Sequence, residues 1–200
     1  MGARLDIINN MLSMAGEFTA DADTDSHPDV VTCGRILDKV RKQILGKGWW
    51  FNTITMTLGV NASDQIEVPQ SAMALDATDP ARNVSIRGAV LYDHDNNSLT
   101  FTDGVECEVI QDLDEDDIPP IALSYIEWCA VVRFLAVQQV TGEPVADAKT
   151  AKADALVDLN AERYRKQDTN FNNTPMGRRM KTFQRRGVGS YNLARKTTDE

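Results

Sequence analysis

The hydrophobic residues of this 200-residue chain change their spacing twice, and these two changes limit the folds that it can adopt. Before residue 53, apolar residues recur every three or four positions, as Val30, Cys33 and Leu37 do. That spacing is typical of helices with one buried face. Residues 53–111 instead alternate apolar and polar side chains, which is typical of short strands, and helical spacing returns after residue 112. The pattern therefore predicts an α+β fold.

Glycine and proline mark the expected ends of the first two helices. The first runs from about residue 5 and ends at Gly16, a residue that suits a helix C-cap. For the second, the sequence predicts Ser26 as N-cap with Pro28 in the first turn, and Gly46 and Gly48 as the stop. Three aromatic residues follow at once and are expected to anchor this helix to the next element as part of the core: Trp49, Trp50 and Phe51.

The middle of the chain predicts a small antiparallel β module. Turn signals at 93–97 and at Asp103-Gly104 separate its short apolar runs. The strand candidates are residues 54–58, 66–68, 84–86, 89–92, 99–101 and 105–110.

Two further helices are expected after the β module. The acidic run 112–117 precedes Pro119-Pro120 and is typical of the start of a helix. Residues 121–141 are apolar on nearly every side and contain Glu127 and Arg133, so we expect a central core helix rather than a membrane span, ended by Gly142. Residues 144–167 form the fourth helix, with a narrow face of alanines.

The predicted architecture is a four-helix bundle, made of two N-terminal and two C-terminal helices, with an inserted β module and an extended basic C-terminal tail. The predicted divisions are residues 1–52 (N-terminal helices), 53–111 (β-rich module), 112–167 (C-terminal helices) and 168–200 (tail).

The charge of the chain is divided unevenly along its length. The whole chain carries net charge −9, but residues 1–160 hold 11 basic and 26 acidic side chains, whereas residues 161–200 hold 10 basic and 4 acidic ones. Such a tail is expected to dock on something negative, which could be nucleic acid, another protein or an acidic face of a neighbouring copy; a solvated tail is the simpler alternative. Its candidate binding residues are Arg178, Arg179, Lys181, Phe183, Arg185, Arg186 and Tyr191.

The sequence offers little for catalysis. The two histidines, His27 and His94, lie beside turn signals, and the chain lacks the nucleophile-elbow, zinc-protease and phosphate-loop motifs. Its three cysteines are far apart, which excludes a zinc ribbon and fits a reducing compartment. Residues 93–97 resemble the opening of a calcium loop but lack the glycine and glutamate that follow in one, so a hairpin turn is favoured. A non-enzyme without cofactor or metal is expected.

The order of several segments resembles the tail tubular protein A family, the head-to-tail adaptors of short-tailed bacteriophages. These segments are "INNMLSMAGE", the Gly-Trp-Trp-Phe-Asn sequence that closes the second helix, the strand-rich middle, "DLDEDDIPPIALSYI" and "EWCAVVRFLAVQQVTG". The likeness covers about residues 4–167.

The resemblance implies a structural virion protein. Members form a dodecameric ring under the portal protein, connect it to the nozzle (tail tubular protein B), and let genomic DNA pass through the lumen without sequence-specific binding. It implies a location in the short tail at the portal vertex, assembly in the host cytoplasm, no membrane, and tail fibres as a further partner. The seven tail residues would then bind the portal. The alternative is a nucleic-acid-binding module that grips DNA or RNA through the basic tail, with the strong salt dependence of phosphate contacts.

Overall fold

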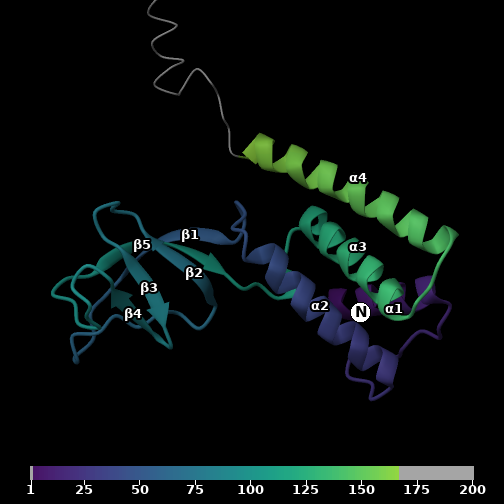
Figure 1. The fold of residues 1–200 in the computed structure, drawn as a ribbon, viewed down its shortest axis with the longest axis horizontal. Helices are drawn as coiled ribbons and strands as arrows, with labels where there is room; N and C mark the ends of the chain where they lie inside the picture. The colour runs from purple at the N-terminus through teal and green to yellow at the C-terminus, as the bar shows by residue number, and fades with distance from the viewer. Residues whose placement is uncertain (1, 167–200) are drawn as a thin grey trace, which may run out of the picture. The chain divides into compact units, whose positions relative to one another are not determined.

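The computed structural model describes residues 2–166, which contain four helices and two small antiparallel sheets. The helices are α1 (Ala3–Ala15), α2 (Pro28–Leu45), α3 (Pro120–Val137) and α4 (Glu143–Lys166), with a short 3-10 helix, η1 (Glu115–Asp117), before α3 (Figure 1). The strands are β1 (Thr53–Leu58), β2 (Ala72–Ala77), β3 (Val84–Arg87), β4 (Val90–Asp93) and β5 (Val105–Gln111). The α+β class is confirmed. The bundle arrangement of the helices, the four divisions of the chain and the basic tail stay predictions.

The N-terminal helices end where their glycines predict. Gly16 adopts φ 80° and closes α1, with its N–H bonded to Ser13 and the N–H of Glu17 bonded to the Leu12 carbonyl. The predicted N-cap of α2 is wrong. His27 directly precedes the first helical residue, and its ring Nδ1 accepts the Asp29 N–H at 3.4 Å. Ser26 stands one residue too early to cap the helix.

Helix α3 ends at Val137, earlier than the predicted stop at Gly142. Gln139 adopts a left-handed φ of 56°, and the N–H of Val140 bonds to the Leu135 carbonyl at 3.0 Å. These two features close the helix before the glycine is reached.

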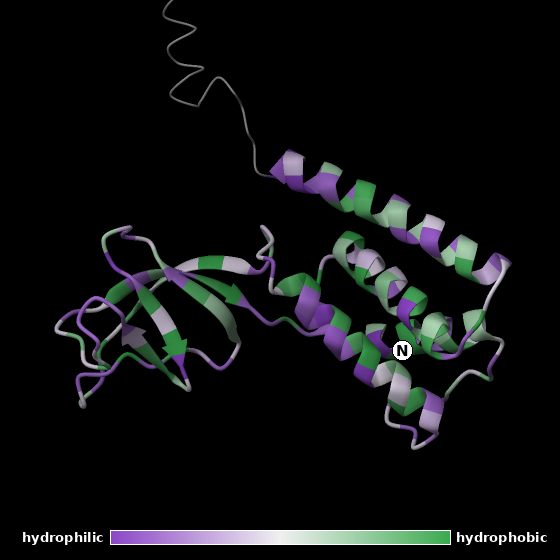
Figure 2. Ribbon diagram, in the orientation of Figure 1, coloured by the Kyte–Doolittle hydropathy of each residue, from purple (hydrophilic) through white to green (hydrophobic). Residues whose placement is uncertain are grey.

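All four helices contribute to one hydrophobic core. Helix α3 packs against both α1 and α2, and Ile126 and Phe134 are fully buried. Helix α4 adds Ala148, Ala155 and Leu159 to the same core, so the predicted alanine face is the buried one. Hydrophilic and hydrophobic residues alternate along α4 (Figure 2).

Among the described residues, α3 is long and apolar enough to cross a membrane by length and composition, with a mean hydropathy of 1.5. Its packing against α1 and α2 in the shared core accounts for the apolar composition.

The β segment forms two antiparallel sheets whose buried residues share one hydrophobic core. Strand β5 is central in the first, with β1 and β2 antiparallel on its two sides. Its buried face includes Val105, Cys107 and Val109, and its other face exposes Glu106 and Glu108. The second sheet is the β3–β4 hairpin, whose two-residue turn starts at Gly88 with φ 65°, as glycine permits.

Two predicted strands do not form, and one strand was missed. Residues 66–68 make only single bridges, from Ile66 to Val60 and from Glu67 to Val90. Residues 99–101 are not a strand either; Phe101 is buried, and its N–H bonds to the Asp64 carbonyl. The missed strand is β2, whose alanine-rich sequence has low intrinsic β propensity and which is formed by pairing with β5.

Candidate functional site

The most charged feature of the described structure is a network of ion pairs between α1, α2 and η1. Arg41 of α2 is only 8% exposed and donates hydrogen bonds to the Leu113 carbonyl at 2.9 Å and to Asp114 at 3.0 Å. Arg4 of α1 bonds to Asp38 at 2.8 Å and to Glu115 at 2.9 Å, and the bond to Asp38 raises the pKa of Arg4. The network lines a hollow of about 500 Å³.

This network corrects the interpretation of the acidic run 112–117. The sequence predicts only that these carboxylates mark the start of a helix. The structure instead places Glu115, which is 7% exposed, against both arginines, with Arg41 at 3.6 Å. A buried carboxylate needs such partners, since an unpaired one would carry a large desolvation cost. The run therefore ties the entry of α3 to α1 and α2.

The three aromatic residues after α2 lie against the helical core. Trp49 is 6% exposed, and its indole N–H donates to the Ile44 carbonyl at 2.8 Å. Trp50 stacks edge-on against both neighbours, with ring centroids 6.1 Å from Trp49 and 5.2 Å from Phe51. The guanidinium of Arg163, in α4, lies 5.5 Å from the Trp49 ring centroid. The group thus touches both α2 and α4.

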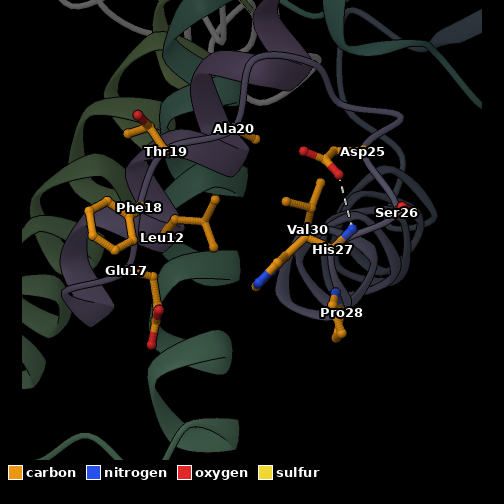
Figure 3. Close-up of a pocket in the computed structure, with 10 residues that line it drawn as sticks. All are labelled: Leu12, Glu17, Phe18, Thr19, Ala20, Asp25, Ser26, His27, Pro28 and Val30. Atoms are coloured by element: carbon orange, nitrogen blue, oxygen red, sulfur yellow. Dashed lines mark hydrogen bonds between the residues drawn. The ribbon is translucent and has the colours of Figure 1, made fainter.

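An exposed acidic loop, residues 17–27, joins α1 to α2. Asn9 holds it at one point, accepting the Ala20 N–H at 2.7 Å and donating to the Ala20 carbonyl at 3.1 Å. Figure 3 shows the hollow of about 440 Å³ beside the loop, with Leu12 and Ala20 on one side and Val30 and His27 on the other.

Phe18, in the same loop, is 96% exposed. Sequence reasoning missed this residue. The available signal was a single large aromatic side chain within an acidic loop, where no apolar periodicity calls for one.

The histidines lie at a helix cap and on a turn, and two of the three cysteines are buried. His27 caps α2, and His94 lies on an exposed turn, with its Nε2 2.8 Å from the Ser85 hydroxyl. Burial raises the pKa of Cys33 to about 12 and also raises that of Cys107. Across residues 2–166, no three His, Cys, Asp or Glu side chains are grouped so that they could hold a metal ion. The seven predicted portal-binding residues, Arg178 to Tyr191, lie outside the described residues.

The similarity of the chain to one protein family extends over nearly its full length and decides the family. A family model described as tail tubular protein matches residues 5–193. The chain belongs to the tail tubular protein family. A similar relative is tail tubular protein A of Klebsiella phage KP34, which is 27% identical over 122 residues. That match covers 61% of this chain and 66% of the relative, just under two thirds of its length.

Membership in the tail tubular protein family confirms the resemblance drawn from the sequence segments. The chain is therefore a structural protein of a phage tail, and its place is the virion tail.

Proposed function

We propose that this tail tubular protein is a head-to-tail adaptor that forms a ring under the portal and joins it to the tail nozzle. The observation that carries the proposal is the extent of the family match. It runs from residue 5 through the helices and strands and on to residue 193, and so includes every basic and aromatic residue assigned to portal binding.

The basic tail is the proposed portal-binding segment. Its arginines supply forked hydrogen bonds to carboxylates, and Phe183 and Tyr191 supply apolar anchoring area. A segment of this kind can gain order on its partner, at an entropic cost that the new contacts offset. The remainder of the chain is acidic and attracts the basic tail, so the portal must offer forked carboxylate contacts and apolar pockets that outcompete the chain's own body.

The acidic body suits the proposed role as a DNA conduit. On the three-stranded sheet, Asp76 lies opposite Glu108 in the register, and both are exposed together with Glu106. Such a surface repels phosphate. The repulsion would weaken a protein that must bind DNA, but it helps DNA to slide through a channel without being held. DNA retention after packaging and DNA passage during ejection are part of the same proposal.

The remaining parts of the proposal concern assembly. We infer a ring of twelve copies, contact with the nozzle protein, attachment of fibres and assembly in the host cytoplasm. We also propose that the segments of the chain have different roles. Residues 1–167 would form the ring, and residues 168–200 would reach the portal.

Truncation of the tail tests the portal-binding assignment. A chain that ends at Thr169 should keep its far-UV circular dichroism per helical residue but should not bind the cognate portal ring in a pull-down. A matched control replaces two exposed basic residues of α2, Lys39 and Lys42, with alanine and should bind as the full chain does. If the truncated chain binds the portal as well as the full chain, the tail is not the docking segment.

A further inference from the structure

A third hollow lies between α2, α3 and α4 and has an apolar floor with a basic rim. Its volume is about 480 Å³. An apolar cavity of about 150 Å³ is large enough to hold a benzene ring, so this hollow has room for a phenyl side chain. The residues of its floor are Val40, Ile44, Tyr125, Cys129, Val132 and Ala136.

The rim carries three cations, Lys47, Arg133 and Lys152. Arg133 donates to the neutral Gln43 side chain at 2.9 Å, and within residues 2–166 the structure pairs none of the three with a carboxylate. All three act on the thiol of Cys129 and lower its pKa, although burial outweighs them and raises it. The hollow is therefore a positive site in an acidic protein.

The loop that holds Phe18 has the opposite charge. Its exposed carboxylates are Glu17, Asp21, Asp23 and Asp25, and Phe18 itself is 96% exposed. The two hydrogen bonds between Asn9 and Ala20 fix the backbone two residues from the phenylalanine. The loop thus presents an aromatic side chain on an anchored backbone, which lowers the entropic cost of docking.

We propose that Phe18 of one copy inserts into the α2–α3–α4 hollow of a second copy, with the acidic loop facing the basic rim. An aromatic anchor in an apolar pocket surrounded by complementary charges is the usual arrangement of a strong interface centre. The two patches differ, so each copy donates a loop to one neighbour and accepts a loop from another. Such head-to-tail contacts generate a ring when the rotation from one copy to the next closes on itself, which the proposed adaptor ring requires. The inference rests on the proposed ring and supplies its contact.

Charge reversal on the two patches tests the pairing. The loop variant is Glu17→Lys with Asp21→Lys, and the hollow variant is Lys47→Glu with Lys152→Glu. Each variant alone should self-associate more than about tenfold more weakly than the original chain, because like charges then face each other. An equimolar mixture should recover association, since each loop then meets a hollow of opposite charge in the other variant.

Association is measured by sedimentation velocity over a concentration series and by electron microscopy on portal rings. The matched control is Lys39→Glu with Lys42→Glu, which reverses two exposed cations of α2 that do not line the hollow. This control should change neither the self-association nor the ring seen on the portal. Association that survives in both single variants, or a mixture no better than either of them, would overturn the proposal.

A cross-link between copies tests the contact itself. In the variant Thr19→Cys, which keeps Phe18, a short bismaleimide should join residue 19 of one copy to Cys129 of the next, giving a ladder of cross-linked species on a denaturing gel. The ladder should vanish in Thr19→Cys with Cys129→Ser. The reaction is run with and without the portal ring. A second ring on the portal with no Cys129-dependent cross-link would overturn this inference and leave the adaptor function standing; absence of the ring itself would count against the adaptor function.

Discussion

The side-chain amide of Asn52 donates a hydrogen bond of 2.9 Å to the carbonyl oxygen of Gln111, 59 residues away in the chain. The Gln111 N–H donates in return to the Asn52 carbonyl at 2.8 Å. Asn52 is fully buried, and its amide also bonds to the Leu45 carbonyl and to the Trp49 N–H. One side chain therefore joins the end of α2, the aromatic group and the end of β5.

Replacement of Asn52 by alanine should reduce the free energy of unfolding by about 2–4 kcal/mol, because it leaves a buried N–H and two buried carbonyls without their partner. Chemical denaturation followed by tryptophan fluorescence measures the change. Asn160→Ala, at a partly exposed position of α4, serves as the control and should change the free energy by less than about 0.5 kcal/mol. Equal effects of the two variants would contradict the role assigned to Asn52.

Replacement of Arg41 by alanine should cost about 3–5 kcal/mol of unfolding free energy, since it removes a partner of the buried Glu115 and the donor to the Leu113 carbonyl. Arg41→Lys should recover only part of the loss, because an ammonium group cannot span several acceptors as a guanidinium does. Arg35→Ala, exposed on the same helix, is the matched control. Urea unfolding of the three variants gives the comparison, and an Arg41→Ala variant as stable as the original would refute the network's importance.

The pH dependence of stability should contain a contribution from Glu127. Burial raises the pKa of Glu127 above its ordinary 4.5, although a hydrogen bond from Asn10 lowers it in part. A carboxyl whose pKa is raised on folding favours the folded state fully at low pH, and this contribution is lost as the pH rises through the raised value.

Glu127→Gln, which keeps an oxygen to accept from Asn10, should therefore melt at a higher temperature than the original chain at about pH 7 and match it near pH 4. Thermal unfolding at the two pH values checks this, with the exposed Glu106→Gln as control. A lower melting temperature at neutral pH would show that the charge of Glu127 is favourable instead.

Thiol reactivity should distinguish the three cysteines. Burial raises the pKa of all three thiols, but Cys33 and Cys107 are fully buried, whereas Cys129 is partly exposed in the hollow. A colorimetric disulfide reagent should therefore react quickly with one thiol in the native chain and with three in denaturant. Cys129→Ser should remove the fast reaction; a fast reaction that persists would mean that another cysteine is accessible.

Local signals explain what the sequence predicted of the fold. Helices α1 and α2 were foreseeable because periodicity, Pro28 and Gly16 act within a few residues, and β3 and β4 were foreseeable as the short apolar runs 84–86 and 89–92. Strand β2 was not, since its alanine-rich sequence becomes a strand only by pairing with β5, some 30 residues on.

The candidate site was harder to predict because its contacts are long-range. The acidic run 112–117 is visible in the sequence, but its partners Arg4 and Arg41 come from helices more than 70 residues earlier. Nor could the pattern show that Phe18 stands in solvent, since an aromatic residue after a helix is as easily a core residue.

The measurement that most directly tests the adaptor function is electron microscopy of the purified chain mixed with its cognate portal ring. The account predicts a second ring stacked coaxially on the portal, with residues 168–200 reaching the portal and the acidic loop of each copy seated on its neighbour. An intact portal ring that carries no second ring would contradict the account. Nucleic acid would then be the favoured partner of the basic tail.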